Sequence, residues 1–386
     1  MIDPSLLAAM SERDHAAYAA GLRVREQGAA GPRSPRVGIG LTVYNRAQYL
    51  GEALDSLLAQ QCQDFRLIIV DDASTDESEA IARDCEQRDR RVRYLRHDTR
   101  RGMVETWRRA FDEATAGDRP PEYFAWASDH DRWHPEWLGT LVGALEAAPE
   151  VVLAYPLTQR IAPDGTPLAK PAREFDTFGV HDRATRWARI SGSDSVAAGD
   201  MVYGLMRVEA ARAAGVFRPV LCPDRLLIAE LTLQGQIRQV PSVLWYRRRF
   251  GAGSIERQRF TLFAPGAPVP SRFTPPWYMH ARALWRTYAT GALPVCGSKT
   301  SAARMIARYA GEYAWRHYRK TTVSGSLWAV LGWPIWLFKR AKHATLVSAY
   351  HALVALRRLG VTPALERACE ALTGRPRPWR RASSKP

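Results

Sequence analysis

The sequence predicts an α/β protein with a mostly parallel sheet flanked by helices, and two observations carry this prediction. Apolar runs of strand length alternate with amphipathic helical segments from residue 36 to residue 155, which is typical of a parallel sheet with helices on both faces. In addition, three of the apolar runs end in polar or acidic clusters, which a parallel sheet would bring to one edge. The expected strands are 36–43, 67–70, 92–95, 123–127 and 151–155, and the expected helices include 47–61, 103–114 and the segment that follows Pro135.

The most informative cluster is Val-Asp-Asp-Ala-Ser-Thr-Asp at residues 70–76. Ser74 and Glu77 have the spacing of a capping box, which predicts that a helix begins directly after Ser74. Carboxylates beyond the carboxyl end of a strand lie where open α/β sheets bind ligands, so Asp71 and Asp72 could accept hydrogen bonds from a base or a ribose. The alternative is that these side chains only cap the helix.

Two other strands end in similar clusters. Tyr44-Asn45-Arg46 follows the first strand, and Ser128-Asp129-His130-Asp131 follows the strand at 123–127. Paired carboxylates suit Mg²⁺ or Mn²⁺, which prefer oxygen ligands and commonly bridge a nucleotide diphosphate. The three clusters together therefore predict a nucleotide site with a divalent cation.

The order of these motifs resembles that of family 2 glycosyltransferases, which have the GT-A fold. The matching residues are Thr42-Val43-Tyr44-Asn45, then residues 70–76, then the acidic cluster with Trp133 and Pro135 behind it. The resemblance extends over about residues 36–250. It implies that a nucleotide-sugar donor binds at this edge of the sheet and that the sugar is transferred with inversion.

The resemblance also implies which residues bind the donor. Tyr44 would stack on the nucleobase, Thr42 would bond its edge, and Asp72 would read the base. Two arginines are expected near the phosphates, and for each the alternative is an exposed charged run. The complete predicted nucleotide-sugar set is Thr42, Tyr44, Asn45, Asp71, Asp72, Arg101, Asp129 and Arg247.

The acidic cluster allows two alignments with the family. Read as an Asp-x-Asp signature, it has Asp129 at the ribose and Asp131 at the metal. An alignment anchored on Trp133 and Pro135 instead puts His130 in the metal position. We expect Asp131 to be the ligand, because a hard cation prefers a carboxylate to an imidazole.

In relatives the general base lies about 90 residues after the acidic signature, in an acidic motif at a helix start. Asp224, in Cys222-Pro223-Asp224, occupies that place and is the predicted base. The usual Glu-Asp pair is reduced to Pro-Asp here. Glu230 is expected to be structural, and Asp200 is an alternative contact for the acceptor.

Composition suggests several segments and a reducing environment. Five scattered cysteines form no zinc-ligand spacing, and the first residues lack the pattern of a signal peptide, so we expect a cytoplasmic protein. The expected segments are an N-terminal arm (1–35), a GT-A domain (36–262, with a donor half at 36–135 and an acceptor half at 136–262), a proline-rich linker (263–276), a helical, Trp-rich basic extension (277–374) and a disordered basic tail (375–386).

The net charge of +16 is concentrated in the C-terminal third. Residues 270–386 contain 20 Lys and Arg against 3 Glu, whereas the other 269 residues contain 35 basic and 36 acidic groups. This surplus predicts an anionic partner. The apolar segment 323–338 is shorter than the roughly 20 residues needed to span a bilayer, and its tryptophans fit an interfacial helix. We expect peripheral binding to the inner face of the cell membrane; the alternative is that this segment packs on the catalytic domain.

The sequence thus predicts an inverting, metal-dependent glycosyltransferase that acts on a glycan or lipid-linked acceptor in the synthesis of surface polysaccharide or glycolipid; no nucleic-acid partner is expected. Two alternatives stay open. A sugar nucleotidyltransferase would need a glycine-rich basic loop for a triphosphate, whereas Gly38 and Gly40 lie inside a predicted strand. A non-catalytic polyanion-binding protein would retain only a degenerate transferase domain.

Overall fold

The structure is a computed structural model that describes residues 35–169, 174–192, 198–250, 255–267, 270, 274–289 and 297–321. The chain divides into two compact units, residues 1–314 and 315–386, and the fold below belongs to the first. Three predicted segments lie outside the described residues: the N-terminal arm except residue 35, the Trp-rich segment 323–338 and the basic tail 375–386.

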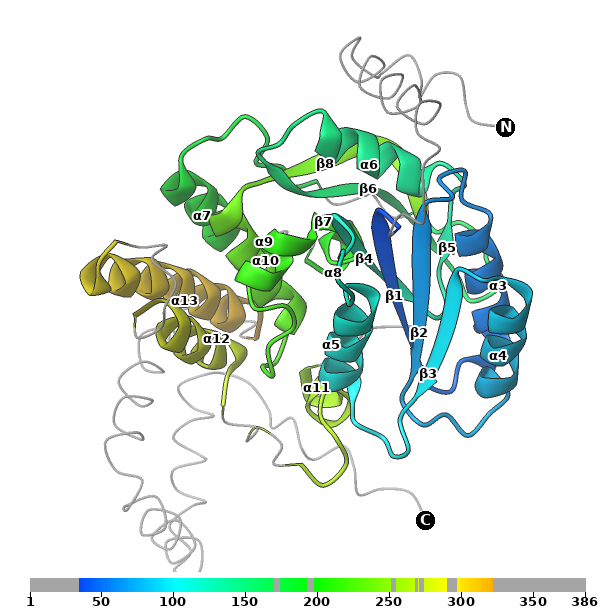
Figure 1. The fold of residues 1–386 in the computed structure, drawn as a ribbon. Helices are drawn as coiled ribbons and strands as arrows, with labels where there is room; N and C mark the ends of the chain where they lie inside the picture. Colours follow the sequence, from blue (N-terminus) through cyan, green and yellow to red (C-terminus); the bar gives the residue numbers. More distant parts are fainter. Residues whose placement is uncertain are drawn as a thin grey trace, which may run out of the picture. The chain divides into compact units, whose positions relative to one another are not determined.

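The first unit is built on an eight-stranded sheet with the order β3-β2-β1-β4-β7-β6-β8-β5 (Figure 1). Four of its seven neighbouring pairs are parallel, namely β3/β2, β2/β1, β1/β4 and β6/β8. This confirms the prediction of a mostly parallel sheet. The strands are β1 (Val37–Val43), β2 (Phe65–Asp71), β3 (Val92–Arg96), β4 (Tyr123–Ser128), β5 (Arg132–Trp133), β6 (Val151–Ile161), β7 (Leu205–Arg207) and β8 (Gln236–Arg248).

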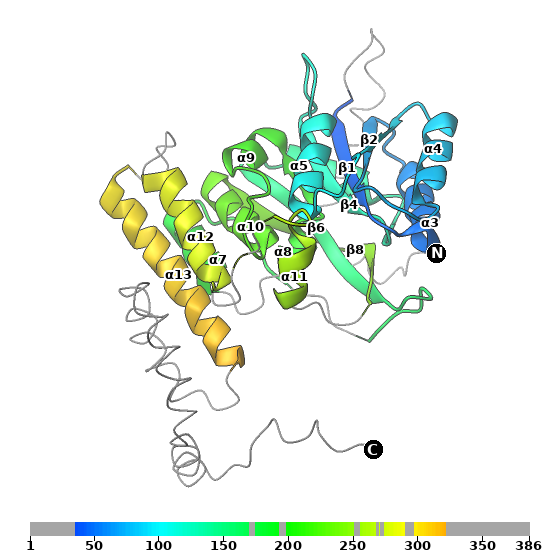
Figure 2. The ribbon, with the colours of Figure 1, turned by 90° about the horizontal axis from the view of Figure 1, so that it is seen from below.

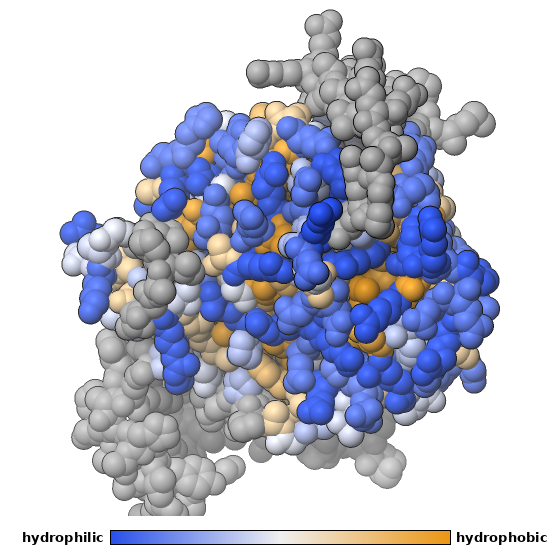
Figure 3. Space-filling view, viewed as in Figure 1, coloured by the Kyte–Doolittle hydropathy of each residue, from blue (hydrophilic) through white to orange (hydrophobic). Residues whose placement is uncertain are grey.

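Helices cover both faces of this sheet, with α5 on one face and α3 and α4 on the other (Figure 1). Hydrophilic residues cover most of the side seen in this view, and hydrophobic residues show between them near its middle (Figure 3). The described helices are α3 (Ala47–Leu58), α4 (Ser78–Arg88), α5 (Met103–Ala114), α6 (Trp137–Glu146), α7 (Arg183–Gly192), α8 (Ala198–Met201), α9 (Val208–Ala213), α10 (Pro223–Gln234), α11 (Ile255–Thr261), α12 (Pro276–Leu284), the π-helical turn η2 (Trp285–Ala289) and α13 (Lys299–Thr321).

The two glycines of β1 allow α5 to lie close to the sheet. A Cβ atom at Gly38 would lie 2.6 Å from the carbonyl oxygen of Ala114, and one at Gly40 would lie 3.0 Å from the Cβ of Ala110. Any larger residue would push the helix away. These glycines therefore serve packing inside a strand and do not form a phosphate-binding loop.

The capping box predicted at Ser74 is wrong, because α4 begins four residues later, at Ser78. The Ser74 amide donates to Asp71 Oδ1 (2.7 Å), and its hydroxyl accepts the Asn45 amide (3.1 Å). Ser74 is thus committed to joining two loops. The Ser78 amide is instead bound by Asp76 Oδ1 at 3.0 Å.

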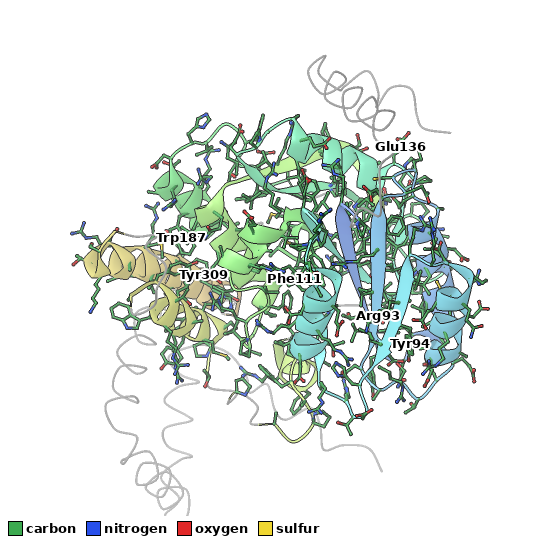
Figure 4. The ribbon with its side chains drawn as sticks, viewed as in Figure 1. Arg93, Tyr94, Phe111, Glu136, Trp187 and Tyr309 are labelled. Atoms are coloured by element: carbon green, nitrogen blue, oxygen red, sulfur yellow. The ribbon has the colours of Figure 1, made fainter. Side chains whose placement is uncertain are left out.

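Within the first unit, residues after 275 contact α7 and α10, which lie nearby in Figure 2; the Tyr288 hydroxyl of η2 donates to Glu230 on α10 at 3.1 Å. The indole Nε1 of Trp187 on α7 donates to the carbonyl of Met305 (3.0 Å), and its ring lies 5.2 Å from that of Tyr309 (Figure 4). The predicted boundaries at 262 and 277 stay predictions. In the part of the chain that the structure describes, no helix is both long and apolar enough to cross a bilayer.

Candidate active site

The three polar motifs meet at one edge of the sheet. In the parallel pairing of β1 with its neighbours, Val43 lies opposite Asp71 and Thr42 lies opposite Ser128. The Tyr44 amide donates to Asp129 Oδ2 at 3.4 Å, which joins the first motif to the acidic cluster. The buried Ser128 hydroxyl has no hydrogen-bond partner among the described residues, so a polar group at this edge is left for a ligand or water.

Asn45 joins the first motif to the second. It adopts a positive φ of 50°, a conformation that Asn tolerates better than most residues. Its side-chain oxygen accepts the Thr75 amide at 2.8 Å, and its own amide donates to the Ser74 hydroxyl. Asn45 therefore fixes the two loops, and its predicted contact with the donor stays a prediction.

Asp71 faces the interior. Its carboxylate is fully buried, with Oδ1 bound by the Ser74 amide and Oδ2 bound by the Tyr94 hydroxyl at 2.8 Å. Burial, together with this hydrogen bond, raises the pKa of Tyr94. Tyr94 lies on β3 (Figure 4). Both oxygens of Asp71 thus fix the turn after β2. The predicted contact of Asp71 with the nucleotide stays a prediction.

Asp72 instead holds the loop that precedes α5. Its carboxylate accepts the amides of Arg101 (2.6 Å) and Gly102 (3.0 Å), and it lies 3.6 Å from the Arg100 guanidinium. The Arg101 side chain is exposed. The arginine that lies over Tyr44 is Arg100, with its guanidinium carbon 4.1 Å from the ring centroid. Sequence analysis predicted a role for Arg101 but not for Arg100. The two adjacent arginines before Gly102 were the available indication that Arg100 could serve instead.

The acidic cluster places His130 between two carboxylates. His130 Nδ1 lies 2.5 Å from Asp129 Oδ1, and its Nε2 lies 3.8 Å from Asp131 Oδ1. Burial alone would lower the pKa of His130, but the hydrogen bond to Asp129 and the charges of both carboxylates outweigh it and raise this pKa. Asp131 is 1% exposed and accepts the Arg248 amide at 2.7 Å.

Arg248, which belongs to the same basic run as the predicted Arg247, anchors this cluster. Its Nε donates to the His130 carbonyl at 2.8 Å, and its guanidinium also binds the Pro163 carbonyl and the Glu52 carboxylate. The neighbouring Arg247, also on β8, contacts two residues of α8. Its guanidinium donates to Asp200 Oδ1 (2.6 Å) and to the Gly199 carbonyl (2.7 Å).

The chemistry of the donor set fits a cation that binds together with its substrate. Among the residues that the structure describes, no group of three His, Cys, Asp or Glu side chains could hold a metal. Asp129 and Asp131 nevertheless offer two carboxylates at the sheet edge. Mg²⁺ is usually held by one or two carboxylates plus substrate phosphates and water, so a fuller protein cage is not required.

The predicted base lies at the start of α10. Cys222, with a φ of 52°, precedes the helix, and Pro223 occupies its first turn. A Cβ atom at Gly199 would lie 3.6 Å from Asp224 Oδ2 and 3.3 Å from Arg247 Nη1, so both charged groups face Gly199. Exclusion of water raises the pKa of Asp224, against the opposing effects of the Arg225 amide and the Arg247 charge.

Asp200 is neutralised by two arginines. It is 3% exposed, and it pairs with Arg160 Nη2 at 2.5 Å as well as with Arg247 Nη1 at 2.6 Å. Each oxygen of this carboxylate is therefore occupied by a guanidinium donor, which leaves it poorly placed to bind an acceptor hydroxyl. This arrangement leaves Asp224 as the better candidate for a base.

Residues 39–202 match the family described as glycosyl transferase family 2. This segment is a family 2 glycosyltransferase domain. The chain is 51% identical over 49 residues to an uncharacterized glycosyltransferase of Rickettsia prowazekii (13% of this chain, 15% of the relative). It is 29% identical over 138 residues to the putative teichuronic acid biosynthesis glycosyltransferase TuaG of Bacillus subtilis (35% of this chain, 52% of the relative).

The fold agrees with this family. The crystal structure of S. aureus TarS 1-349 in complex with UDP-GlcNAc superposes with a TM-score of 0.50 and 15% identity, over 74% of this chain and 73% of that one. The predicted GT-A-type fold is thereby confirmed. The match covers 15% of the length of the first curated relative and 52% of TuaG.

Tyr203 directly follows the matched segment and was missed by sequence analysis; the Arg247 guanidinium carbon lies 6.0 Å from its ring centroid. Its pKa is raised by burial, and the charges that act on its hydroxyl come from both halves of the site. Its ring packs 4.9 Å from that of Trp245. The position of Tyr203 shortly after Asp200, in Met-Val-Tyr-Gly, was the available indication in the sequence that it lies near the site. The Arg247 charge opposes the rise of this pKa, and the charges of three carboxylates add to it: Asp131, Asp129 and Asp224.

Proposed function

We propose that this protein transfers a sugar, with inversion and with the help of a divalent cation, from a nucleotide-diphospho-sugar to a hydroxyl group of an acceptor. One observation carries the proposal beyond the family match. Adjacent residues of β8 link the two groups: the Arg248 amide donates to Asp131 in the acidic cluster, and the Arg247 guanidinium lies with Asp224 beside Gly199. A donor-binding group and a base therefore share one small region.

The nucleoside would lie at the ends of β1 and β2. Tyr44 is 37% exposed, so its ring can pack against a base, and Arg100 already lies on that ring. A planar guanidinium and a phenol ring can both stack on an aromatic base. Thr42 and Asp72 would supply hydrogen bonds near the base, and Arg247 would lie beside the diphosphate.

Asp131 and Asp129 would hold a Mg²⁺ or Mn²⁺ ion. When bound, the ion would neutralise the charge that develops on the leaving nucleoside diphosphate. His130 lies between the two carboxylates, 2.5 Å from Asp129 Oδ1 and 3.8 Å from Asp131 Oδ1. Arg248 keeps Asp131 in place through its backbone amide, at 2.7 Å.

Asp224 would remove the proton from the acceptor hydroxyl. Inversion needs one general base on the face of the sugar opposite the leaving group, and no protein acid is required if the leaving group is neutralised otherwise. The raised pKa of Asp224 makes it a stronger base than an exposed carboxylate.

We further propose that the acceptor is a glycan or a lipid-linked sugar of the cell envelope, reached at the cytoplasmic membrane face. The basic surplus of the C-terminal third supports this setting, because such charge attracts anionic lipid headgroups. The sugar nucleotidyltransferase alternative is not favoured, because Gly38 and Gly40 pack against α5.

Calorimetric titration of UDP, dTDP and GDP, each with and without Mn²⁺, tests the proposal. We expect one diphosphate to bind more tightly with Mn²⁺. Asp131→Asn should remove that metal-dependent gain, roughly tenfold or more in affinity, while still accepting the Arg248 amide. Asp112→Asn, at an exposed position on α5, is the matched control.

Loss of the metal-dependent gain in affinity in His130→Ala but not in Asp131→Asn would assign the metal to His130. A protein that binds no diphosphate would be a non-catalytic scaffold.

A further inference from the structure

A cavity of about 480 Å³ lies between α12 and the loop that leads into α10. Its volume falls in the usual range of about 300–1,000 Å³ for small-molecule sites. The lining residues include the apolar Val220, Met279 and Ala283 and the basic Arg218, Arg282 and Arg286.

The charged residues among those that line this cavity are all arginines. Arg282 and Arg286 are four residues apart on consecutive helical turns, so they lie on the same side. No acidic residue is among the described residues that line the cavity. Arg218 is fixed by the buried Glu230, with bonds of 2.8 and 2.7 Å, whereas Arg282 forms no ion pair with any described residue.

The cavity and the proposed base lie on the same stretch of chain. Val220 lines the cavity, and Asp224 follows four residues later. Between them, the Leu221 carbonyl accepts a bond of 2.6 Å from His280 Nε2, which ties α12 to this loop. A molecule in the cavity would thus be held next to the segment that carries Asp224.

We infer that this cavity binds a phosphate-bearing amphiphile. The arginines would hold the phosphate oxygens, for which guanidinium groups provide paired donors. The apolar wall would cover the first carbons of the attached chain. The shared chemistry is a phosphate on an alkyl or isoprenyl chain, and its source is either a lipid-linked acceptor or a membrane phospholipid. Only the link to an acceptor rests on the proposed function.

Calorimetry with soluble probes on the full chain tests this inference. The probes are inorganic phosphate, hexyl phosphate and dihexanoyl-phosphatidylglycerol. We expect an amphiphile to bind at least about tenfold more tightly than inorganic phosphate, because burial of its alkyl carbons adds hydrophobic free energy. Tighter binding of hexyl phosphate indicates a phosphomonoester such as a lipid-phosphate carrier, and tighter binding of the phosphatidylglycerol indicates membrane lipid.

Two charge-matched double variants locate the binding. Arg282→Gln/Arg286→Gln should weaken amphiphile binding at least about tenfold. Arg304→Gln/Arg308→Gln, an exposed pair with the same spacing on α13 and outside the cavity, should leave it unchanged. Equal losses in both variants, no preference over inorganic phosphate, or no binding would each overturn the inference.

The same variants separate this inference from the proposed function. Nucleoside diphosphate binding in the presence of Mn²⁺ should be unchanged in Arg282→Gln/Arg286→Gln, because the arginines lie outside the donor site. If the amphiphile does not bind but the diphosphate does, only the cavity assignment fails. If the diphosphate does not bind to any variant, the proposed transfer fails, and binding of the amphiphile is judged by the double variants alone.

Discussion

Asp71 and Asp72 are adjacent in the sequence but have different environments. Asp71 is bound by the Ser74 amide and the Tyr94 hydroxyl inside the domain, whereas Asp72 holds the backbone of Arg101 and Gly102. Asp200 and Asp224 differ in a similar way. Two arginines form ion pairs with Asp200, whereas burial raises the pKa of Asp224 against the effects of the Arg225 amide and the Arg247 charge. The surroundings of a carboxylate therefore decide its chemistry.

At the residue scale, we predict that Asp224→Asn retains donor affinity but lowers turnover by about 10² or more. Asparagine has the same size but cannot accept the proton. Single-turnover assays and donor titrations measure the two effects. Glu209→Gln, on the surface of α9, is the control. If affinity and turnover fall together, Asp224 is structural.

The pH profile of turnover gives a second test of the same residue. A base works only when it is deprotonated, and the pKa of Asp224 is raised, so the acidic limb of kcat should lie above the ordinary range of Asp. Arg247 opposes this rise, and Arg247→Gln should therefore move the limb to higher pH at saturating donor. A limb that does not move would show that another group titrates.

At the element scale, the start of α10 is held by helices distant in sequence. His280 on α12 is completely buried between the Leu221 carbonyl (2.6 Å) and the Tyr309 hydroxyl (2.8 Å). The Arg225 guanidinium lies 4.4 Å from the ring of Tyr313 on α13. The turn that carries Asp224 is therefore stabilised by α12 and α13.

This arrangement predicts a pH-dependent stability. Burial lowers the pKa of His280 to about 3, and the nearby Arg225 charge acts in the same direction. The unfolded chain binds a proton at this histidine below about pH 6.5 and the folded chain does not, so stability falls as the pH drops towards 3. The neighbouring Tyr309, Tyr313 and Cys222 stay neutral in this range, since burial raises their pKa values.

Urea denaturation at several pH values from about 6.5 to about 4 measures the effect. The slope of unfolding free energy against pH should be smaller in His280→Gln than in the wild type, by up to about 1.4 kcal/mol per pH unit. His181→Gln, at an exposed histidine, should retain the wild-type slope. Identical slopes in all three proteins would contradict a neutral His280 in the folded state.

At the scale of the whole molecule, the charge is divided unevenly. Residues 322–386 contain 11 Lys and Arg and 2 Glu, a surplus of 9, together with Trp328, Trp333, Trp336 and Trp379. Lys or Arg near an anionic membrane contributes about 1 kcal/mol each, which salt screens, whereas buried aromatic rings are insensitive to salt.

We predict that the full chain sediments with vesicles that contain phosphatidylglycerol, is partly released by high salt, and is fully released only by detergent. A chain that ends at Thr321 keeps α13 and should stay in the supernatant. Circular dichroism and diphosphate binding control for its folding. If the full chain stays in the supernatant at low salt, or if the shortened chain still sediments, the extension does not provide membrane binding.

The sequence alone determined the class of fold and the edge of the sheet that carries the site. The carboxyl ends of neighbouring parallel strands lie at the same edge of a sheet. Polar clusters that follow such strands are therefore brought together at that edge. Thr42, Asp72, Asp129 and Asp131 were predicted at this edge for that reason. The family motifs added Asp224.

Only the tertiary structure decided how each group is used. The orientation of Asp71, the stacking of Arg100 on Tyr44 and the double pairing of Asp200 depend on contacts between residues distant in sequence. The charges around Tyr203 likewise come from separate elements. Local patterns report periodicity and turn chemistry, but burial and the net effect of neighbouring charges exist only once the chain has folded.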